Sequence, residues 1–410
     1  MKIQKPRGTR DFLPEDNHKR RFYENRLRDT ATRWGYQEIK TPTFESIDLF
    51  TVKSGEGILG EIYNFKDKGD REMALRPELT APVMRMYVNE LQRTPKPVKL
   101  YYFDNCFRYE RPQKGRFREF WQFGAELIGS PRPQADAEVI ALACRMLKAA
   151  GVEGELHVGH LGIIRTLLQG LNDVVQGQIM RLVDKKDDKG LEDYLEEIDA
   201  DIEMREKLFE LIGLTGTEAV AEARNLVGDI EDMNTFQELL NLLDVYGLEY
   251  TINFGIARGL DYYTGMVFEI YSSGLGAQNQ VCGGGSYRLA KLFGGEDVAS
   301  TGFGLGFDRI MEVCTIDVPV EDKVVVVYFE ETRDEAMRIT AMLREYLIVD
   351  IDVMGRGFGA QLKYANTKGA KWAVIAGEDE ISLGKVGLKN MDSGQQDLVN
   401  IDELVQKITS

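Results

Sequence analysis

Cationic side chains are concentrated in the segment FRYERPQKGRFREFWQFGAE, residues 107–126. Arginine guanidinium groups bind phosphate oxygens through paired hydrogen bonds, and several are needed to hold a triphosphate. In the same segment Phe120 could stack on a purine, and Glu110 could accept a hydrogen bond from an exocyclic amine. A solvated, charged turn is the alternative interpretation. The five cations are Arg108, Arg111, Lys114, Arg116 and Arg118.

Two further segments carry polar groups at spacings that suit a ligand. The turn RPELTAP, residues 76–82, offers Glu78 and Thr80. The segment ARGLDYYTGMVFE, residues 257–269, offers Arg258, Asp261, Tyr262 and Tyr263. Tyrosines in strands are usually core or interface residues, so packing is the alternative for this pair.

Glycine is unusually frequent in two segments near the end of this region. In CGGGSYRLAKLFGG, residues 282–295, it would allow the backbone to approach a ligand closely, or simply form a flexible loop. In GFGLGFDR, residues 302–309, glycine occupies every second position before Arg309. On a strand this removes the side chains from one face, where a flat ligand could lie or another strand could pack closely.

Several common kinds of active site are not supported by the sequence. There is no G-x-x-x-x-G-K-[ST] segment, which argues against a P-loop NTPase. The only histidines, His18, His157 and His160, lie outside the segments above. Metal ligation by His157 and His160 lacks a third ligand nearby, and a nucleophilic Ser–His or Cys–His site is equally unsupported. We therefore expect catalysis by positioning and charge stabilisation.

Composition and charge indicate a soluble, multi-domain protein. The chain has 410 residues, is 43% hydrophobic and 29% charged, and carries a net charge of −16. Residues 171–245 hold 20 acidic and 7 basic residues, a net charge of −13, which leaves −3 for the rest. Most of the net negative charge therefore belongs to one segment, and it does not exclude nucleic acid. No signal peptide or apolar run of about 20 residues is evident, so we expect a cytoplasmic protein without membrane segments.

The elements that must position these residues follow from hydrophobic pattern and breakers. We expect a helix from Pro14 to Gly35, and two β-runs around PQKG that place the cations on a hairpin. A helix should follow at 133–151, and strands should resume near 249. The acidic block lacks proline and is expected to be an inserted helical module. From about 321, strands and helices alternate, which predicts a small α/β domain with parallel strands.

Together these segments resemble a class II aminoacyl-tRNA synthetase, and specifically the histidyl-tRNA synthetase family. FRYERPQKGRFREF resembles motif 2, GFGLGFDRI motif 3 and GYQEIKTPTFES motif 1. ARGLDYYTGMVFE and, more loosely, CGGGSYRLAKLFGG resemble the two histidine-binding motifs. The resemblance covers essentially the whole chain.

The resemblance implies an α+β fold, with an antiparallel sheet flanked by helices and a C-terminal α/β anticodon-binding domain. It divides the chain into a catalytic core at 1–167 and 247–318, a helical insertion at 168–246, and the anticodon-binding domain at 319–410. It also implies ATP-dependent ligation of L-histidine to tRNA(His) through a histidyl-adenylate, with Mg²⁺ on the ATP phosphates. A homodimer is expected from motif 1 alone.

Roles for single residues also follow from the resemblance. Arg108 would bind the α-phosphate, Glu110 and Phe120 the adenine, and Arg116 and Arg309 the distal phosphates. Arg108 and Arg258 would be catalytic. The residues expected to bind histidine are Glu78, Thr80, Gln122, Glu126, Arg258, Tyr262, Tyr263 and Tyr287.

One position pair departs from the family pattern. The second histidine motif usually reads G-R-Y-D, and this chain has Gly285-Ser286-Tyr287-Arg288. The hydrogen bonding around Tyr287 therefore has to differ.

Three other functions remain open at this point. A regulatory paralogue of ATP phosphoribosyltransferase would lack the C-terminal domain, and a synthetase for threonine or proline would lack LDYYTG. A plain nucleic-acid-binding module would not need Glu78 and Glu126 beside an ATP-type hairpin.

Overall fold

The computed structural model describes residues 3–54, 56–109, 117–257 and 262–409. The chain forms two compact units, Met1–Ile316 and Asp317–Ser410, each with its own sheet. Within the described residues, no helix has both the length and the apolar character that crossing a bilayer would require.

The first unit is built on an eight-stranded sheet with the strand order β1-β5-β6-β11-β10-β9-β7-β8. Neighbouring strands are antiparallel except at the two outer pairs, β1–β5 and β7–β8, which are parallel. Both parallel pairs are joined by long connections, which parallel pairing requires. The expected antiparallel sheet is confirmed, with parallel edges. The strands are β1 Gln37–Glu38, β5 Val98–Phe107, β6 Glu119–Ile128, β7 Glu155–His160, β8 Thr251–Ile252, β9 Tyr263–Tyr271, β10 Gln280–Tyr287 and β11 Ser300–Gly306.

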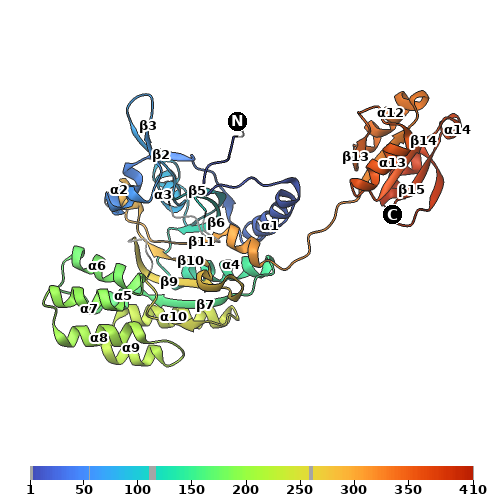
Figure 1. Ribbon diagram of the computed structural model, residues 1–410. Coiled ribbons are helices and arrows are strands. Elements are labelled where there is room, and N and C mark those ends of the chain that lie inside the picture. Colours follow the sequence, from blue (N-terminus) through green and yellow to red (C-terminus); the bar gives the residue numbers. More distant parts are fainter. Residues whose placement is uncertain (1–2, 55, 110–116, 258–261, 410) are drawn as a thin grey trace. The chain divides into compact units, whose positions relative to one another are not determined.

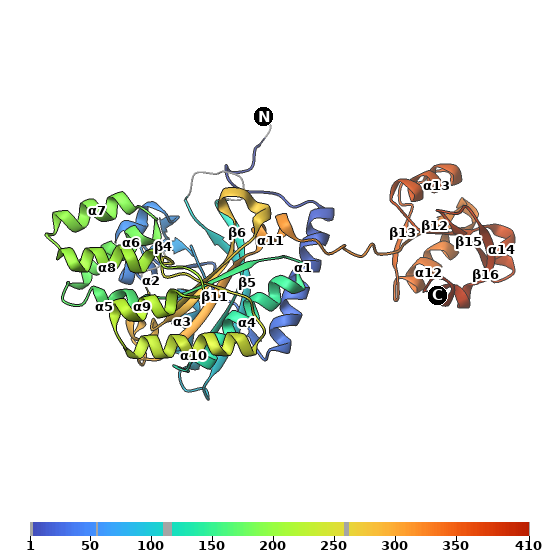
Figure 2. The same cartoon turned by 90° about the horizontal axis from the view of Figure 1, so that it is seen from below.

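Helix α4, Pro133–Ala149, packs on the central strands β6, β10 and β11. Its proline stands at the first helical position, where no backbone donor is lost, and its apolar face is fully buried. Helix α1, Pro14–Arg33, and helix α10, Glu231–Val245, both pack against α4, and the three form a layer (Figure 2).

A smaller three-stranded sheet, β2-β4-β3, precedes the hairpin in the sequence. A turn at residues 76–79 joins its strand β4 to helix α3, which continues into one π-helical turn, Tyr87–Leu91. The elements are β2 Phe44–Ser46, β3 Asn64–Lys66, β4 Glu72–Leu75, α2 Asp48–Ser54, α3 Thr80–Met86 and α11 Phe307–Val313. Short 3₁₀ turns cover Glu56–Gly60, Ser273–Gln278, Ala290–Phe293, Glu330–Thr332 and Ile401–Glu403.

The acidic segment folds into helices that gather beside β7 and β9 (Figure 1). Side chains of Asn172, Asp187 and Asp201 accept hydrogen bonds from the first turns of α6, α7 and α8, which fixes where those helices begin. Each helix buries an apolar stripe, and most of its acidic residues face solvent. The helices of this segment are α6 Asp173–Asp184, α7 Asp188–Glu197, α8 Ile202–Gly213, α9 Ala219–Val227 and α10, and α5, Leu161–Leu167, precedes them.

The second unit contains a five-stranded sheet with the order β13-β12-β14-β15-β16. Strands β13, β12 and β14 are parallel, as expected, but β15 and β16 add an antiparallel edge that the sequence analysis did not anticipate. The connections before β15 and β16 are too short to cross over the sheet, so only antiparallel pairing is possible. The elements are β12 Lys323–Tyr328, β13 Ile348–Ile351, β14 Trp372–Ala376, β15 Lys385–Asn390, β16 Gln396–Asn400, α12 Arg333–Leu343, α13 Phe358–Thr367, α14 Glu378–Ser382 and α15 Leu404–Thr409.

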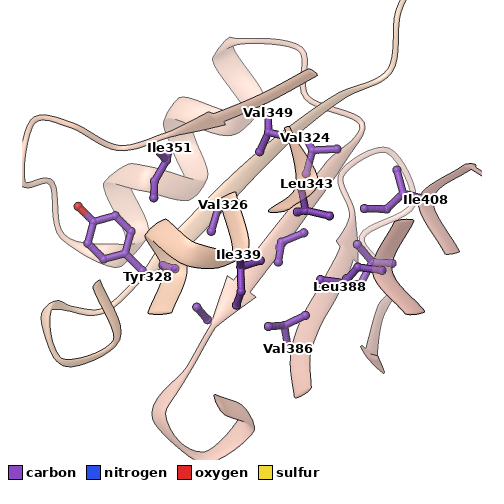
Figure 3. Close-up of a cluster of buried hydrophobic side chains, with 14 of the residues drawn as sticks. Val324, Val326, Tyr328, Ile339, Leu343, Val349, Ile351, Val386, Leu388 and Ile408 are labelled. Carbon is purple, nitrogen blue, oxygen red and sulfur yellow. The ribbon is translucent and has the colours of Figure 1, made fainter. Parts of the chain in front are cut away.

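This unit has its own apolar core. Side chains from β12, β13 and β15 meet Ile339 and Leu343 of α12 and Ile408 of α15 (Figure 3). A separate core means that the unit has the main requirement for folding independently.

Candidate functional site

Strand β6 lies at the centre of the site, between β5 and β11. Its alternate residues Gln122 and Glu126 lie on one face, opposite Gly306 and Gly302 of β11. A Cβ atom on Gly302 would collide with the Glu126 carboxylate. The alternating glycines of β11 therefore do leave one face of that strand without side chains. Glu126 and Gln122 of β6 extend into the space over this face.

Glu126 is the most enclosed carboxyl group of the site, with 1% of its surface exposed. Its carboxylate accepts hydrogen bonds from the Tyr287 hydroxyl at 2.6 Å, Thr80 Oγ1 at 2.9 Å and the Tyr102 hydroxyl at 3.1 Å. Burial raises its pKa to about 8, although the three hydroxyl donors act in the opposite direction. A carboxyl group with this pKa gains or loses its proton near neutral pH.

Glu78 closes the turn that precedes α3. Its carboxylate accepts the backbone N–H of Thr80 at 2.6 Å and that of Ala81 at 3.0 Å. Burial raises the pKa of Glu78, while these backbone donors and the nearby Arg108 partly offset the effect. The turn thereby brings Thr80 against Glu126, so RPELTAP and β6 belong to one site.

Arg76 anchors this turn and was not singled out from the sequence. It is fully buried, and its guanidinium donates to the Thr41 carbonyl at 2.9 Å and the Asn105 carbonyl at 2.8 Å. It also forms an ion pair with Asp104 at 2.7 Å. Arg76 therefore ties together three chain segments directly beside Glu78. Arginine is usually exposed, and a fully buried arginine needs hydrogen-bond and charge partners. The residue type alone does not show which of the two applies to Arg76.

The three candidate tyrosines pack as one aromatic group. The ring of Tyr262 lies 4.7 Å from that of Tyr263 and 5.6 Å from that of Tyr287, measured between centroids. Burial raises the pKa of Tyr262 and Tyr287 well above the ordinary value, so both remain protonated hydrogen-bond donors. The Tyr287 hydroxyl also lies 3.6 Å from the sulfur of Met84 on α3.

The departures on either side of Tyr287 are each paired. Ser286 Oγ donates to Asp136 on α4 at 2.8 Å, and Arg288 forms an ion pair with Asp297 at 3.0 Å. Since neighbouring strand residues point to opposite faces, Ser286 faces α4 while Tyr287 faces α3 and Glu126. The orientation of Tyr287 is therefore kept without the usual arginine and aspartate.

A cavity of about 240 Å³ adjoins this group. Arg108 donates to the Pro77 carbonyl at 2.9 Å, and its guanidinium lies 5.2 Å from the ring of Phe120. Arg309 donates to the Gln280 carbonyl at 2.5 Å. Gln122 lines the cavity next to Gly304 and Gly306 of β11. The cavity is lined by Arg108, Phe117, Phe120, Trp121, Gln122, Gln280, Val281, Cys282, Gly283, Gly304, Gly306, Asp308 and Arg309.

The structure thus brings together ten of the thirteen candidate residues, in two adjoining groups. Glu78, Thr80, Glu126 and the three tyrosines form the enclosed group, and Arg108, Phe120, Gln122 and Arg309 line the cavity. The other three candidates, Glu110, Arg116 and Arg258, lie outside the described residues, as do Arg111, Lys114 and Asp261. The sequence analysis missed Tyr102. It lies opposite Gly124 of β6, and this pairing depends on the strand register, so the sequence alone carried no signal for it.

Comparison with known proteins identifies the family to which the chain is similar. The family model described as Histidyl-tRNA synthetase matches residues 8–310, and the one described as Anticodon binding domain matches residues 319–410. A protein of Methanosarcina acetivorans named Histidine--tRNA ligase is 58% identical over 100% of this chain and 99% of its own length.

Two solved structures are similar over most of the chain. The apo histidyl-tRNA synthetase of S. aureus has a TM-score of 0.74 at 29% identity, covering 99% of this chain and 100% of that one. A Bacillus halodurans protein named as ATP phosphoribosyltransferase regulatory subunit/histidyl-tRNA synthetase has a TM-score of 0.79 at 27% identity, covering 92% and 98%.

The fold is that of a class II aminoacyl-tRNA synthetase. Within that class, the chain belongs to the histidyl-tRNA synthetase family.

Proposed function

We propose that this protein ligates L-histidine to the 3′ end of tRNA(His) at the expense of ATP, through a histidyl-adenylate, releasing AMP and pyrophosphate. The observation that carries the proposal is the buried Glu126 carboxyl, held by three hydroxyl groups beside an arginine-lined cavity. Such a pair of sites suits an amino acid with a polar ring on one side and a triphosphate on the other.

The cavity is proposed to take ATP. Arg108 carries a fixed positive charge toward the α-phosphate, and Phe120 offers an aromatic face for the adenine. Arg309 would bind the distal phosphates, where the family resemblance also assigns Arg116, with Glu110 at the adenine. The carboxylate of histidine attacks the α-phosphorus, pyrophosphate leaves, and no protein nucleophile is needed. Fixed cations that meet charge developing in the transition state provide the rate enhancement.

The enclosed group is proposed to select histidine. An imidazole has two ring nitrogens, and a carboxyl group together with a tyrosine hydroxyl can pair with both. Glu126 and Tyr263 are assigned to the ring, and Tyr262 and Tyr287 to the pocket wall. A site that must pair its buried polar groups rejects ligands lacking them by about 10⁴–10⁵-fold. Glu78, Thr80 and Gln122 would take the α-ammonium group, and Arg258 the carboxylate and the α-phosphate.

The second unit is proposed to bind the anticodon end of tRNA. Although the unit is acidic overall, residues 353–377 contain four basic and no acidic residues. At the carboxyl end of β12, Phe329 is 40% exposed and stacks on Phe358 at 4.6 Å with 7° between the rings. Arg356 is fixed nearby by Asp352, which is almost fully buried and lies 2.6 Å away. Aromatic faces beside cations suit unpaired bases and their phosphates.

Three finer expectations remain proposals. Mg²⁺ is expected to arrive with ATP, bound to its phosphates. In the described part of the chain, no group of three or more metal-ligating side chains was found that could hold an ion alone. Homodimerisation rests on the resemblance of motif 1, and a cytoplasmic location rests on the expectation stated from the sequence.

The test is amino-acid-dependent exchange of pyrophosphate into ATP with Mg²⁺. We expect exchange with histidine and with no other standard amino acid. Exchange with threonine or proline would contradict the assignment of the enclosed group. No exchange with any amino acid, in a preparation that is folded, would favour the regulatory alternative, against which the C-terminal unit already argues.

A further inference from the structure

The N-terminal arm, residues 3–13, runs from the start of the described chain to helix α1 and contacts the motif 2 hairpin. The carbonyl of Gly8 accepts the backbone N–H of Arg118 at 2.9 Å. Gly8 has a φ of +86°, and a Cβ there would lie 2.8 Å from Arg118 Cγ. Only glycine therefore lets the arm lie this close to the hairpin.

The arm also reaches the cavity wall through Asp308. This carboxylate is 5% exposed and accepts the backbone N–H of Trp121 at 2.8 Å. Two guanidinium groups converge on its Oδ1, Arg10 of the arm at 2.7 Å and Arg20 of α1 at 2.7 Å. Two cations on one anion leave a net positive charge behind the wall, next to Arg309.

Aromatic contacts extend the same connection. The Arg10 guanidinium lies 3.4 Å from the ring centroid of Phe117, which lines the cavity. Phe12 of the arm meets Trp121, another lining residue, edge to face at 5.3 Å. Arg20 lies 4.0 Å from the ring of Phe12. Side chains of the arm thus contact cavity-lining residues on two elements, Trp121 on β6 and Asp308 at the start of α11.

We infer that the N-terminal arm is a structural part of the ATP site and that Arg10 is its positioning residue. Arg10 fixes Asp308 and Phe117, and thereby the neighbouring Arg309 and the base of the hairpin, without touching the nucleotide. The inference rests on the proposed function only in taking ATP as the ligand of the cavity. If the docked arm raises the affinity for ATP, ATP must stabilise docking of the arm by the same factor, because coupling between two sites is reciprocal.

The first test compares full-length Arg10→Ala with the wild-type chain by calorimetric titration with ATP and Mg²⁺, and separately with histidine. We expect the Kd for ATP to rise about ten-fold, as for the loss of one charged contact, and the Kd for histidine to change less than about two-fold. Arg10→Lys should recover part of the ATP affinity, because it keeps the charge but not the planar contact with Phe117. Arg21→Ala is the matched control, since Arg21 is exposed on α1 and pairs with Glu24.

The second test uses the reciprocal effect on the wild-type chain. Limited trypsin cleavage after Arg7 and Arg10 should slow when ATP and Mg²⁺ are present, and not with histidine alone. If Arg10→Ala weakened the binding of ATP and of histidine equally and also lowered the Tm, Arg10 would have a merely structural role, and the inference would be overturned. An unchanged ATP Kd would also overturn it. A wild-type chain that binds no ATP would overturn the proposed function as well.

Discussion

Glu126 combines features that are rarely found in one carboxyl group. It is nearly inaccessible to water, it has three hydroxyl donors, and its pKa of about 8 lies close to physiological pH. A neutral imidazole beside a protonated carboxyl has the same number of protons as an imidazolium beside a carboxylate. Histidine bound to Glu126 as proposed would therefore need no proton exchange with solvent near neutral pH, which suits a pocket closed by tyrosines.

We predict that Glu126→Gln raises the KM for histidine about ten-fold or more and changes the KM for ATP little. The amide keeps one acceptor oxygen, but its NH₂ group faces hydroxyls that were donors. The amide also carries no charge, so the charge-assisted hydrogen bond to the imidazole ring, worth about 1.5–3 kcal/mol, is lost. Pyrophosphate exchange at varied concentrations of each substrate measures both constants. Equal changes in both would assign Glu126 to structural support of motif 2.

A second prediction concerns the pH dependence of stability. The pKa of Glu126 is raised from 4.5 to about 8 on folding, so the folded chain keeps a proton that the unfolded chain releases. The stabilisation is complete below about pH 4.5 and is lost progressively as the pH rises to about 8. We expect the decrease in Tm between about pH 5 and about pH 8 to be smaller in Glu126→Gln than in the wild type.

Asp136 and Glu78, whose pKa values are also raised, act in the same direction and remain in the variant, so the slope should shrink without vanishing. Glu210→Gln, at an exposed position of α8, is the control. Parallel melting curves for the wild type and Glu126→Gln across this range would contradict the assigned pKa.

Strand β11 shows how one element serves both groups of the site. Its alternating glycines lie in register with β6, so Gly302 faces Glu126 and Gly304 lies near Gln122. A Cβ on Gly302 would meet the Glu126 carboxylate and lie 2.7 Å from the Ala125 carbonyl, whereas one on Gly304 would meet nothing closer than 3.7 Å. The same substitution should therefore have different effects at two positions of one strand.

We predict that Gly302→Ala destabilises the protein by about 1–3 kcal/mol, the usual effect of overpacking, and raises the KM for histidine because Glu126 must move. Gly304→Ala should leave the stability nearly unchanged and lower the affinity for ATP, since Gly304 lines the cavity. Denaturant unfolding and substrate titrations on both variants separate the effects. If both alanines lowered stability equally, the glycine face would serve only close strand packing.

The whole molecule is divided between two units with separate sheets and cores. The groups proposed for adenylate formation all belong to the first unit, and the aromatic and basic groups at β12 and α13 belong to the second. Chemistry and recognition of tRNA should therefore be separable by mutation.

We predict that truncation after Ile316 preserves most histidine-dependent exchange and strongly reduces charging of tRNA. In the full chain, Phe329→Ala and Arg356→Ala should reduce charging and leave exchange unchanged, because one base stack is worth about 1–3 kcal/mol. Met337→Ala, at an exposed position of α12, is the control. Unaltered charging by both variants would place the tRNA contacts of this unit elsewhere.

The sequence by itself predicted the class of the fold, a helical acidic segment and the candidate residues of the site. Motif 2, RPELTAP and LDYYTG point to the site through the family resemblance, whereas the glycines of motif 3 are visible as a period of two. These are local properties of the chain, set by strand alternation and turn chemistry. The change of pattern near 321 likewise indicated a separate α/β core.

Only the tertiary structure decided which of these groups meet. Tyr102 and Glu126 are 24 residues apart and Tyr287 and Glu126 are 161 apart, and strand register brings their side chains together. The pKa of Glu126 depends on burial, which is a property of all the packed elements. The sequence analysis assigned no role to Arg76 or Arg10, and the buried contacts of Arg76 and the role inferred for Arg10 arise from segments distant in sequence. Long-range pairing and exclusion of water are collective, so no local pattern could have shown them.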